Sequence, residues 1–147
     1  MVATRIPFQT LMRRAAVAFL QDYANDVGVK MQVYPGRPRS IMPPTGFVDL
    51  IRERISYTGL NQRIPQADVI VIHGIFDSME AVNQKDAYVD GFIDWSLDRL
   101  HQANANTLVA VVEVTDIPDY VPDWQPPAEQ RTYYASRITL EGLALSG

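Results

Sequence analysis

His73 is the residue whose type and position most strongly suggest catalysis. It lies in the β-branched run of residues 68–75, at the carboxyl end of an expected strand, where α/β proteins usually bind their ligands. A small enzyme could pair it with a carboxylate such as Asp77 for acid–base chemistry. However, neither a nucleophile-elbow motif nor a glycine-rich phosphate loop surrounds it, since Gly74 is the single glycine of the following turn. We therefore expect a hydrogen-bonded structural histidine.

Three aspartates, Asp116, Asp119 and Asp123, are spaced along residues 115–127 and suggest a calcium or magnesium site. The segment lacks the glycine and the terminal bidentate glutamate of a calcium loop, and its prolines stiffen the backbone. His101 is expected near a helix end, in solvent, where it interacts with the helix dipole. Neither histidine has metal-ligand spacing around it. We expect no catalytic, cofactor-binding or metal-binding set and no cofactor.

Four residues of two proline-rich segments are better suited to contacts with another protein. Arg37 and Arg39 could clamp a carboxylate or phosphate on a neighbour, and the surrounding prolines limit the entropy that docking would cost. Tyr120 and Trp124 are large aromatics, which in such segments either pack back onto the core or anchor an interface. The sequence leaves these two alternatives open. We predict that all four are interface residues.

The composition predicts one globular domain, residues 1–147, with no surface dedicated to nucleic acid. The chain has 147 residues, of which 47% are hydrophobic and 20% charged, enough for a single packed core. Its formal net charge of −4 opposes the basic patch expected of a DNA- or RNA-binding module. The absence of cysteine excludes disulfides and thiolate chemistry. The first residues do not read as a secretory signal, and no apolar run approaches the roughly 20 residues of a membrane span, so we expect neither export nor membrane insertion.

Two helices are expected from apolar residues at three- and four-residue spacing. The first covers residues 6–26, starts near Ile6 or Pro7, and is terminated by Gly28. The second covers residues 77–101, and Asp77 with Glu80 can form its capping box. The apolar stripe of this second helix consists of Tyr88, Val89, Phe92, Ile93, Leu97 and Leu100.

Five strands are expected, over residues 29–34, 47–58, 68–75, 107–114 and 131–143. Proline-rich loops over residues 35–46 and 115–127 separate them, and residues 57–61 form a turn. The runs 68–75 and 107–114 are so apolar that we expect both faces of these strands to be covered. In the strands 47–58 and 131–143, strict alternation predicts odd-numbered residues on one face and even-numbered residues on the other.

The resulting order, helix, three strands, helix, two strands, predicts an α/β (α+β) fold. We expect one domain with a mixed, mostly antiparallel sheet packed by two helices. The residues expected in its core are Phe19, Tyr23, Ile70, Ile72, Phe92, Val111 and Ile138.

The arrangement resembles the tail terminator family of long-tailed bacteriophages, also described as minor tail or tail-completion proteins. The resemblance spans essentially the whole chain and rests on the order and length of elements rather than on a chemical signature. Its parts are the helix 6–26, the approach RSIMPPTGF of residues 39–47 into a strand, the apolar strand 69–75, the helix 78–101, and a closing pair of strands around an acidic loop that contains Trp124.

The resemblance implies a structural virion protein that is made in the host cytoplasm and works in the tail or neck. Such a protein forms a ring, expected to be a hexamer, that caps the tail tube, ends its polymerisation and joins the tail to the head-side connector. A closed ring needs a head-to-tail interface, which long loops and open strand edges can supply. DNA would pass through the lumen without specific binding, and acidic lumen walls would not retain a polyanion.

Three other functions stay open. A different ring protein of the neck or head–tail connector has a similar build. A small enzyme that uses His73 predicts a concave pocket beside that residue. A non-viral adaptor would use the Pro-Pro and Asp-Trp segments for peptide-like contacts.

Overall fold

The computed structural model describes residues 8–56, 62–75, 79–97, 101–103 and 107–144, which form two helices and a six-stranded sheet. In chain order the elements are α1 (Phe8–Val27), β1 (Gln32–Tyr34), β2 (Thr45–Ser56), β3 (Gln62–Ile75), α2 (Met79–Leu97), β4 (His101–Ala103), β5 (Thr107–Tyr120), the short 3₁₀ helix η1 (Pro127–Glu129) and β6 (Tyr133–Ala144). The spatial order of the strands is β1-β2-β3-β6-β5-β4. Only the β1–β2 pair is parallel, so the predicted α+β fold with a mixed, mostly antiparallel sheet is confirmed.

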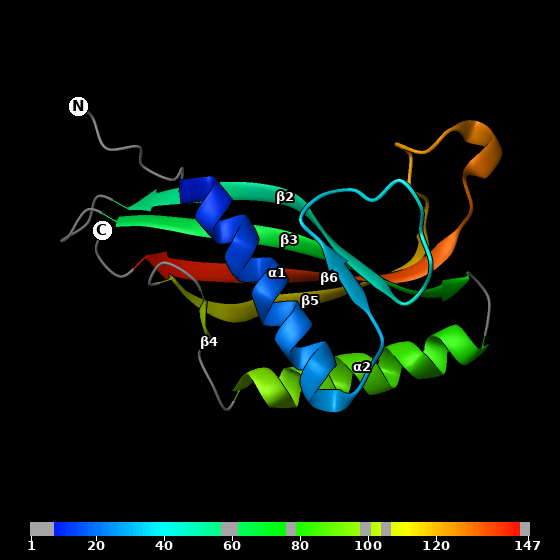
Figure 1. The fold of residues 1–147 in the computed structure, drawn as a ribbon, viewed down its shortest axis with the longest axis horizontal. Helices are drawn as coiled ribbons and strands as arrows, with labels where there is room; N and C mark the ends of the chain where they lie inside the picture. Colours follow the sequence, from blue (N-terminus) through cyan, green and yellow to red (C-terminus); the bar gives the residue numbers. More distant parts are fainter. Residues whose placement is uncertain (1–7, 57–61, 76–78, 98–100, 104–106, 145–147) are drawn as a thin grey trace.

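Both helices pack on the same face of the sheet, which we call the helix face. α1 crosses in front of the strands and α2 runs along one side of them (Figure 1). Alternate residues of the two central strands, β3 and β6, point into a single buried cluster with the inner sides of the helices. The strand members include Val69, Val71, Ile138 and Leu140, and the helix members include Phe19, Tyr23 and Phe92. Among the described residues, neither helix has the length and hydropathy to cross a bilayer.

An aromatic cluster fixes the two helices to each other. The ring centroids of Phe19 and Phe92 lie 5.7 Å apart and those of Tyr23 and Tyr88 lie 5.1 Å apart, both edge-on. Such pairs add about 1 kcal/mol each beyond the area that they bury. The Tyr23 hydroxyl also donates a hydrogen bond of 3.0 Å to the Tyr88 carbonyl, and the Trp95 indole donates one of 2.9 Å to Asp26. α2 is therefore fixed to α1 as well as to the sheet.

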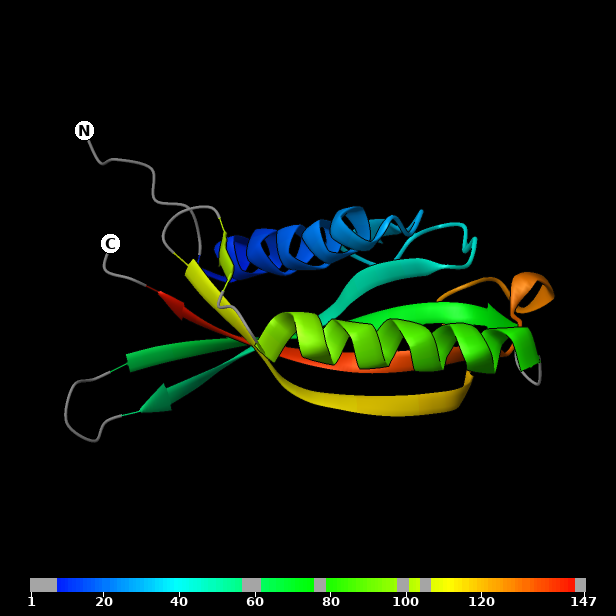
Figure 2. The same cartoon turned by 90° about the horizontal axis from the view of Figure 1, so that it is seen from below.

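Among the described residues, neither α1 nor α2 lies on the opposite face of the sheet, which we call the open face (Figure 2). At one end a second cluster covers it, where Phe47, Ile70 and Ile72 lie under the loops of residues 35–44 and 121–132. Six of the seven predicted core residues are buried, and Val111 is partly buried. The prediction that residues 68–75 and 107–114 are covered on both faces holds only in part. In β3 it holds at this end, while Asp68, at the start of the run, lies on the open face outside the second cluster. In β5 it fails, because Val112 is 51% exposed and Glu113 is also exposed.

The strict alternation predicted for residues 47–58 is wrong. A β-bulge at Asp49 shifts the register of β2, so Val48 pairs with Val69 while Leu50 pairs with Asp68. Phe47, Leu50, Arg52 and Arg54 therefore share the open face, while Val48 and Ile51 pack with the helices. The alternation predicted for the last strand is confirmed in β6, where Ser136, Ile138 and Leu140 lie on the helix face.

Strand β5 is longer than predicted. Residues 115–120, expected in a loop, continue the strand to Tyr120 even though Pro118 lies within it. Pro118 is tolerated because this part of β5 pairs only with β6 and is an edge, where a missing N–H breaks no ladder. A sixth strand, β4, was also missed, and it contains His101, which we expected at a helix end. The expected start of the first helix at Pro7, the turn of residues 57–61 and the capping residue Asp77 lie outside the described residues.

Gly91 of α2 faces the Tyr23 hydroxyl so closely that a Cβ atom would lie 2.8 Å from the Tyr23 oxygen. Gly91→Ala should therefore lower the free energy of unfolding by about 1 kcal/mol, although alanine is the better helix former. In a Tyr23→Phe background the same change should be neutral or stabilising, because the clashing oxygen is gone. Urea denaturation of the four proteins in this cycle measures the difference. Equal effects of Gly91→Ala in both backgrounds would contradict the proposed contact.

Candidate functional site

The two proline-rich loops, far apart in sequence, meet at one end of the sheet. The Trp124 ring packs edge-on against Phe47, with centroids 5.2 Å apart, and Tyr120 lies beside both rings. The Trp124 indole N–H donates a hydrogen bond of 3.2 Å to the Pro38 carbonyl. Trp124 therefore packs back onto the core, the first of the two alternatives that the sequence left open. We call this group of loop residues the loop cluster.

Arg37 completes the loop cluster on its outer side. Its guanidinium carbon lies 5.1 Å from the centre of the Trp124 ring, and its Nε is 3.1 Å from an Asp49 carboxylate oxygen. Burial, with a contribution from the Asp49 carboxylate, raises the pKa of Tyr120, so its hydroxyl is protonated at neutral pH. The bulge that displaces Asp49 from the β2 alternation thus brings its carboxylate to Arg37.

The structure brings three of the four predicted contact residues into one cluster and places the fourth beside it. Arg39 has an exposed side chain, while its carbonyl accepts a hydrogen bond of 3.2 Å from Gln125. Next to it Met42 has 77% of its surface exposed. The loop cluster is therefore a firmly packed base with exposed cationic and apolar side chains at its rim. That these residues contact a partner stays a prediction.

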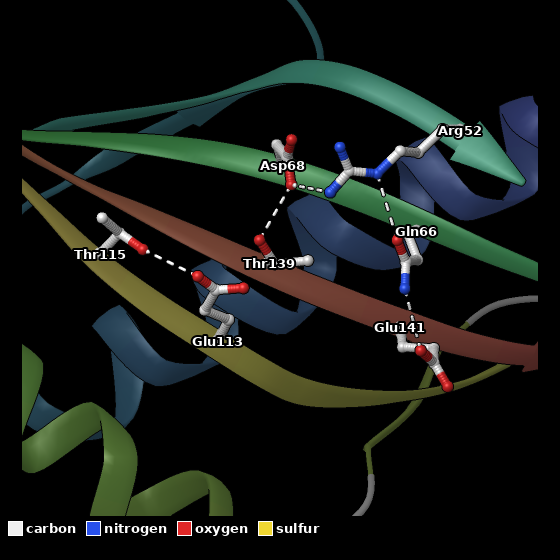
Figure 3. A network of polar contacts seen from close by, with 7 residues as sticks. All are labelled: Arg52, Gln66, Asp68, Glu113, Thr115, Thr139 and Glu141. Carbon is white, nitrogen blue, oxygen red and sulfur yellow. Dashed lines mark hydrogen bonds and ion pairs between the residues drawn. The ribbon is translucent and has the colours of Figure 1, made fainter.

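On the uncovered part of the open face, polar side chains of β2, β3 and β6 are joined by hydrogen bonds and an ion pair, and Thr115 of β5 donates a separate hydrogen bond to Glu113 (Figure 3). Arg52 binds Asp68 at 3.1 Å, and Thr139 donates a hydrogen bond of 2.9 Å to the same carboxylate. Arg52 also donates to Gln66, which in turn donates to Glu141. We call this group the polar network. Asp68 and Thr139 are each only 7% exposed, so the network forms part of the structure.

The polar network was missed from sequence. Its signal was present, because polar residues recur at every second position of three strands, at 52 and 54, at 66 and 68, and at 139 and 141. The bulge at Asp49 hides it, since strict alternation puts Phe47 on the face opposite to Arg52.

His73 is buried between β3, β6 and α2, with 2% of its surface exposed. Its Nε2 lies 2.9 Å from the Ser136 hydroxyl, and its ring lies 5.6 Å from that of Tyr88. Among the described residues its Nδ1 has no hydrogen-bond partner. Burial lowers the pKa of His73 to about 4, while Asp116 opposes this shift and Lys85 adds to it. This geometry agrees with the hydrogen-bonded structural histidine that we expected.

The aspartates considered for metal binding do not share one loop. Asp116 and Asp119 lie in β5, and Asp123 lies in the loop that follows. The ammonium of Lys85 is 3.1 Å from Asp116, and hydrogen bonds to Asp86 and Asp116 raise the pKa of Lys85. Within the described ranges, no three acidic or histidine side chains lie together as a metal site would require.

Comparison of the sequence with protein-family models and with curated proteins finds no match. We therefore infer its function from the geometry of this chain and from the resemblance in its order of elements.

Trp124→Ala should remove the indole that joins the two loops, and we expect the free energy of unfolding to fall by about 3 kcal/mol. Met42→Ala, in the same region but exposed, should change it by less than about 0.5 kcal/mol. Chemical denaturation measures both. If Trp124→Ala were as mild as Met42→Ala, the indole would not hold the loops.

The buried His73 predicts that stability falls with acid. Its folded pKa of about 4 lies below the ordinary value of 6.5, so the unfolded chain binds the proton more readily. Its contribution is therefore present above pH 6.5 and is lost as the pH falls toward 4. Between pH 7 and pH 5 the loss should be about 2 kcal/mol. Urea denaturation at several pH values measures this loss. The stability of His73→Gln should lack this part of the pH dependence, while that of His101→Gln should keep it. Equal pH dependence in His73→Gln and the unchanged protein would disprove the assignment.

Proposed function

We propose that this chain is a ring-forming tail terminator of a long-tailed bacteriophage. In this proposal identical subunits close head to tail on the end of the tail tube, stop its growth, and present a surface to the head-side connector. The ring is expected to contain six copies. The protein would act in the virion, with the tube protein and the connector as its partners, and it needs no cofactor.

The observation that carries the proposal is the two-sided character of the sheet. Its helix face carries the buried cluster that it shares with both helices, while its open face carries the polar network, in which Arg52 is paired with Asp68. A face of this kind suits the wall of a passage for DNA, because unpaired arginines would hold the phosphate backbone. The formal net charge of −4 agrees with such a wall.

The loop cluster supports the second half of the proposal, contact with neighbouring proteins along the tail. Its base is fixed by the packing of Trp124 on Phe47, so the rim that carries Arg39 and Met42 is held in place. A prearranged rim costs little entropy when it docks. A different ring of the neck would use the same open face and rim, and that alternative remains a second candidate on the same observation.

Growth of tail tubes in the presence of the purified protein tests the function. We expect elongation from tube protein to stop, and electron microscopy to show a ring on one end of each tube. Trp124→Ala should reduce this capping. Met42→Ala should leave the fold intact, so reduced capping by this variant would show that the exposed rim contacts the tube. Tubes that keep growing at an unchanged rate, with bare ends, would contradict the terminator function. Binding to the connector without any effect on tube growth would favour the other neck ring.

A further inference from the structure

Both long edges of the sheet are open over most of their length. On one side β4 pairs with β5 only over residues 107–109, and on the other β1 pairs with β2 only over residues 45–47. Among the described strands, residues 110–120 of β5 and 48–56 of β2 therefore have one side without a ladder partner (Figure 1). Open edges of this length are ready to pair with another strand.

The strand directions allow one edge to continue the sheet of another copy. From β2 through β3 and β6 to β5, each strand is antiparallel to its neighbour, so β2 and β5 run in opposite directions. Rotation about a ring axis keeps the direction of every strand relative to that axis. The β5 edge of one copy would therefore meet the β2 edge of the next in antiparallel fashion, as in the rest of the sheet.

On the open face, the charges of the two edges are complementary. β5 contains Glu113, Asp116 and Asp119 and neither lysine nor arginine; Asp116 is bound by Lys85, and Glu113 lies on the open face. β2 as a whole also contains Asp49 and Glu53. On the open face, the β2 edge presents Arg52 and Arg54. The Arg54 side chain is 65% exposed, and its contact with Glu141 within the subunit is a long one of 4.0 Å. Arg54 is therefore available to a carboxylate on a neighbouring strand.

One antiparallel register satisfies charge and apolar surface together. With Glu113 opposite Arg54, Thr115 lies opposite Arg52, and Pro118, which lacks an N–H, falls near the end of the paired region. The same register sets Val112, which lies at an irregularity of the β5–β6 pairing and is 51% exposed, opposite Ile55, which is 56% exposed.

A hollow on α2 lies along the side of the helix that reaches toward β5. It has a volume of about 370 Å³ and is lined by Lys85, Asp86, Val89, Asp90 and Ile93. Because Lys85 contacts Asp116 of β5, this side of α2 borders the open edge. Ile55 of an incoming β2 edge would lie on the helix side of the sheet and find apolar surface there.

We propose that the β5 edge of one subunit pairs in antiparallel fashion with the β2 edge of a second copy of this chain, with Glu113 opposite Arg54. This inference rests on the proposed ring function and names the contact that closes the ring. Because the two edges differ, the contact is head to tail, and each subunit both offers and accepts a strand. The sheets of all copies then form one continuous wall whose inner surface is the open face.

Charge exchange tests the pair. Arg54→Glu and Glu113→Arg should each weaken self-association at least about tenfold, since each sets like charges opposite each other. The combined variant should recover to within about threefold of the unchanged protein. Arg14→Glu, an exposed reversal on α1, is the matched control and should leave association unchanged. Sedimentation of the protein, alone and with tail tubes, gives the readout, and circular dichroism checks folding. Two weakened single variants without recovery in the combination would overturn the pairing.

A cross-link tests the register without relying on charge. The chain has no cysteine, so Arg54→Cys with Glu113→Cys introduces the only two thiols. Opposed positions of antiparallel strands lie close enough for a disulfide or a short cross-linker. Residues 54 and 113 lie at opposite edges of one sheet, so the bond must join two copies. We expect a ladder of covalent multimers beyond the dimer, with peptides that join residues 54 and 113. A lone dimer that joins residue 54 to residue 54, or no ladder, would overturn the proposal.

The two proposals fail in different ways. A ladder with recovery by charge exchange, but without tube capping, would keep the edge pairing and reject the terminator function. If rings cap the tubes but show neither the covalent ladder nor recovery by charge exchange, the terminator function stands and this contact is rejected.

Discussion

The rest of the structure depends on one constraint: two helices cover only one face of this sheet. They bury alternate residues of the central strands, such as Val69 and Ile138, in one cluster with Phe19 and Phe92. The other face has to be made compatible with water or covered by other means. Two loops cover one end of it over Phe47, and ion pairs around Asp68 occupy the remainder. The loop cluster, the polar network and the open edges all follow from this one-sided packing.

The sequence predicts the fold well where the period of apolar residues coincides with a buried face. This holds for α1 and for β6, where Ile138 and Leu140 alternate with polar residues. The prediction fails where a bulge changes the alternation of side chains between the two faces, or where a proline lies within a strand. The bulge at Asp49 leaves no signal in the composition of β2, and Pro118 reads as a loop residue until its place on an edge is known. Both features depend on which strand is the neighbour in the sheet, and the periodicity of apolar residues does not contain that information.

The candidate site is predictable in its residues and not in its geometry. Proline-rich context and side-chain type single out Arg37, Tyr120 and Trp124, yet their contact joins segments more than 80 residues apart. His73 shows the same limit. Its burial could be expected from the apolar run around it, whereas its bond to Ser136 requires the pairing of β3 with β6. Long-range strand pairing decides which side chains contact each other, whereas a single sequence shows only which side chains are chemically able to interact.

We propose that the chain works as a closed ring of identical subunits. Open, complementary edges on opposite sides of one sheet and a polar face that needs no further cover are what such a subunit requires. The most direct measurement is the native mass of the protein, alone and on tail tubes. We expect one closed species of defined copy number, six copies, in solution or on the tube end. A chain that remains a monomer in both conditions would contradict it.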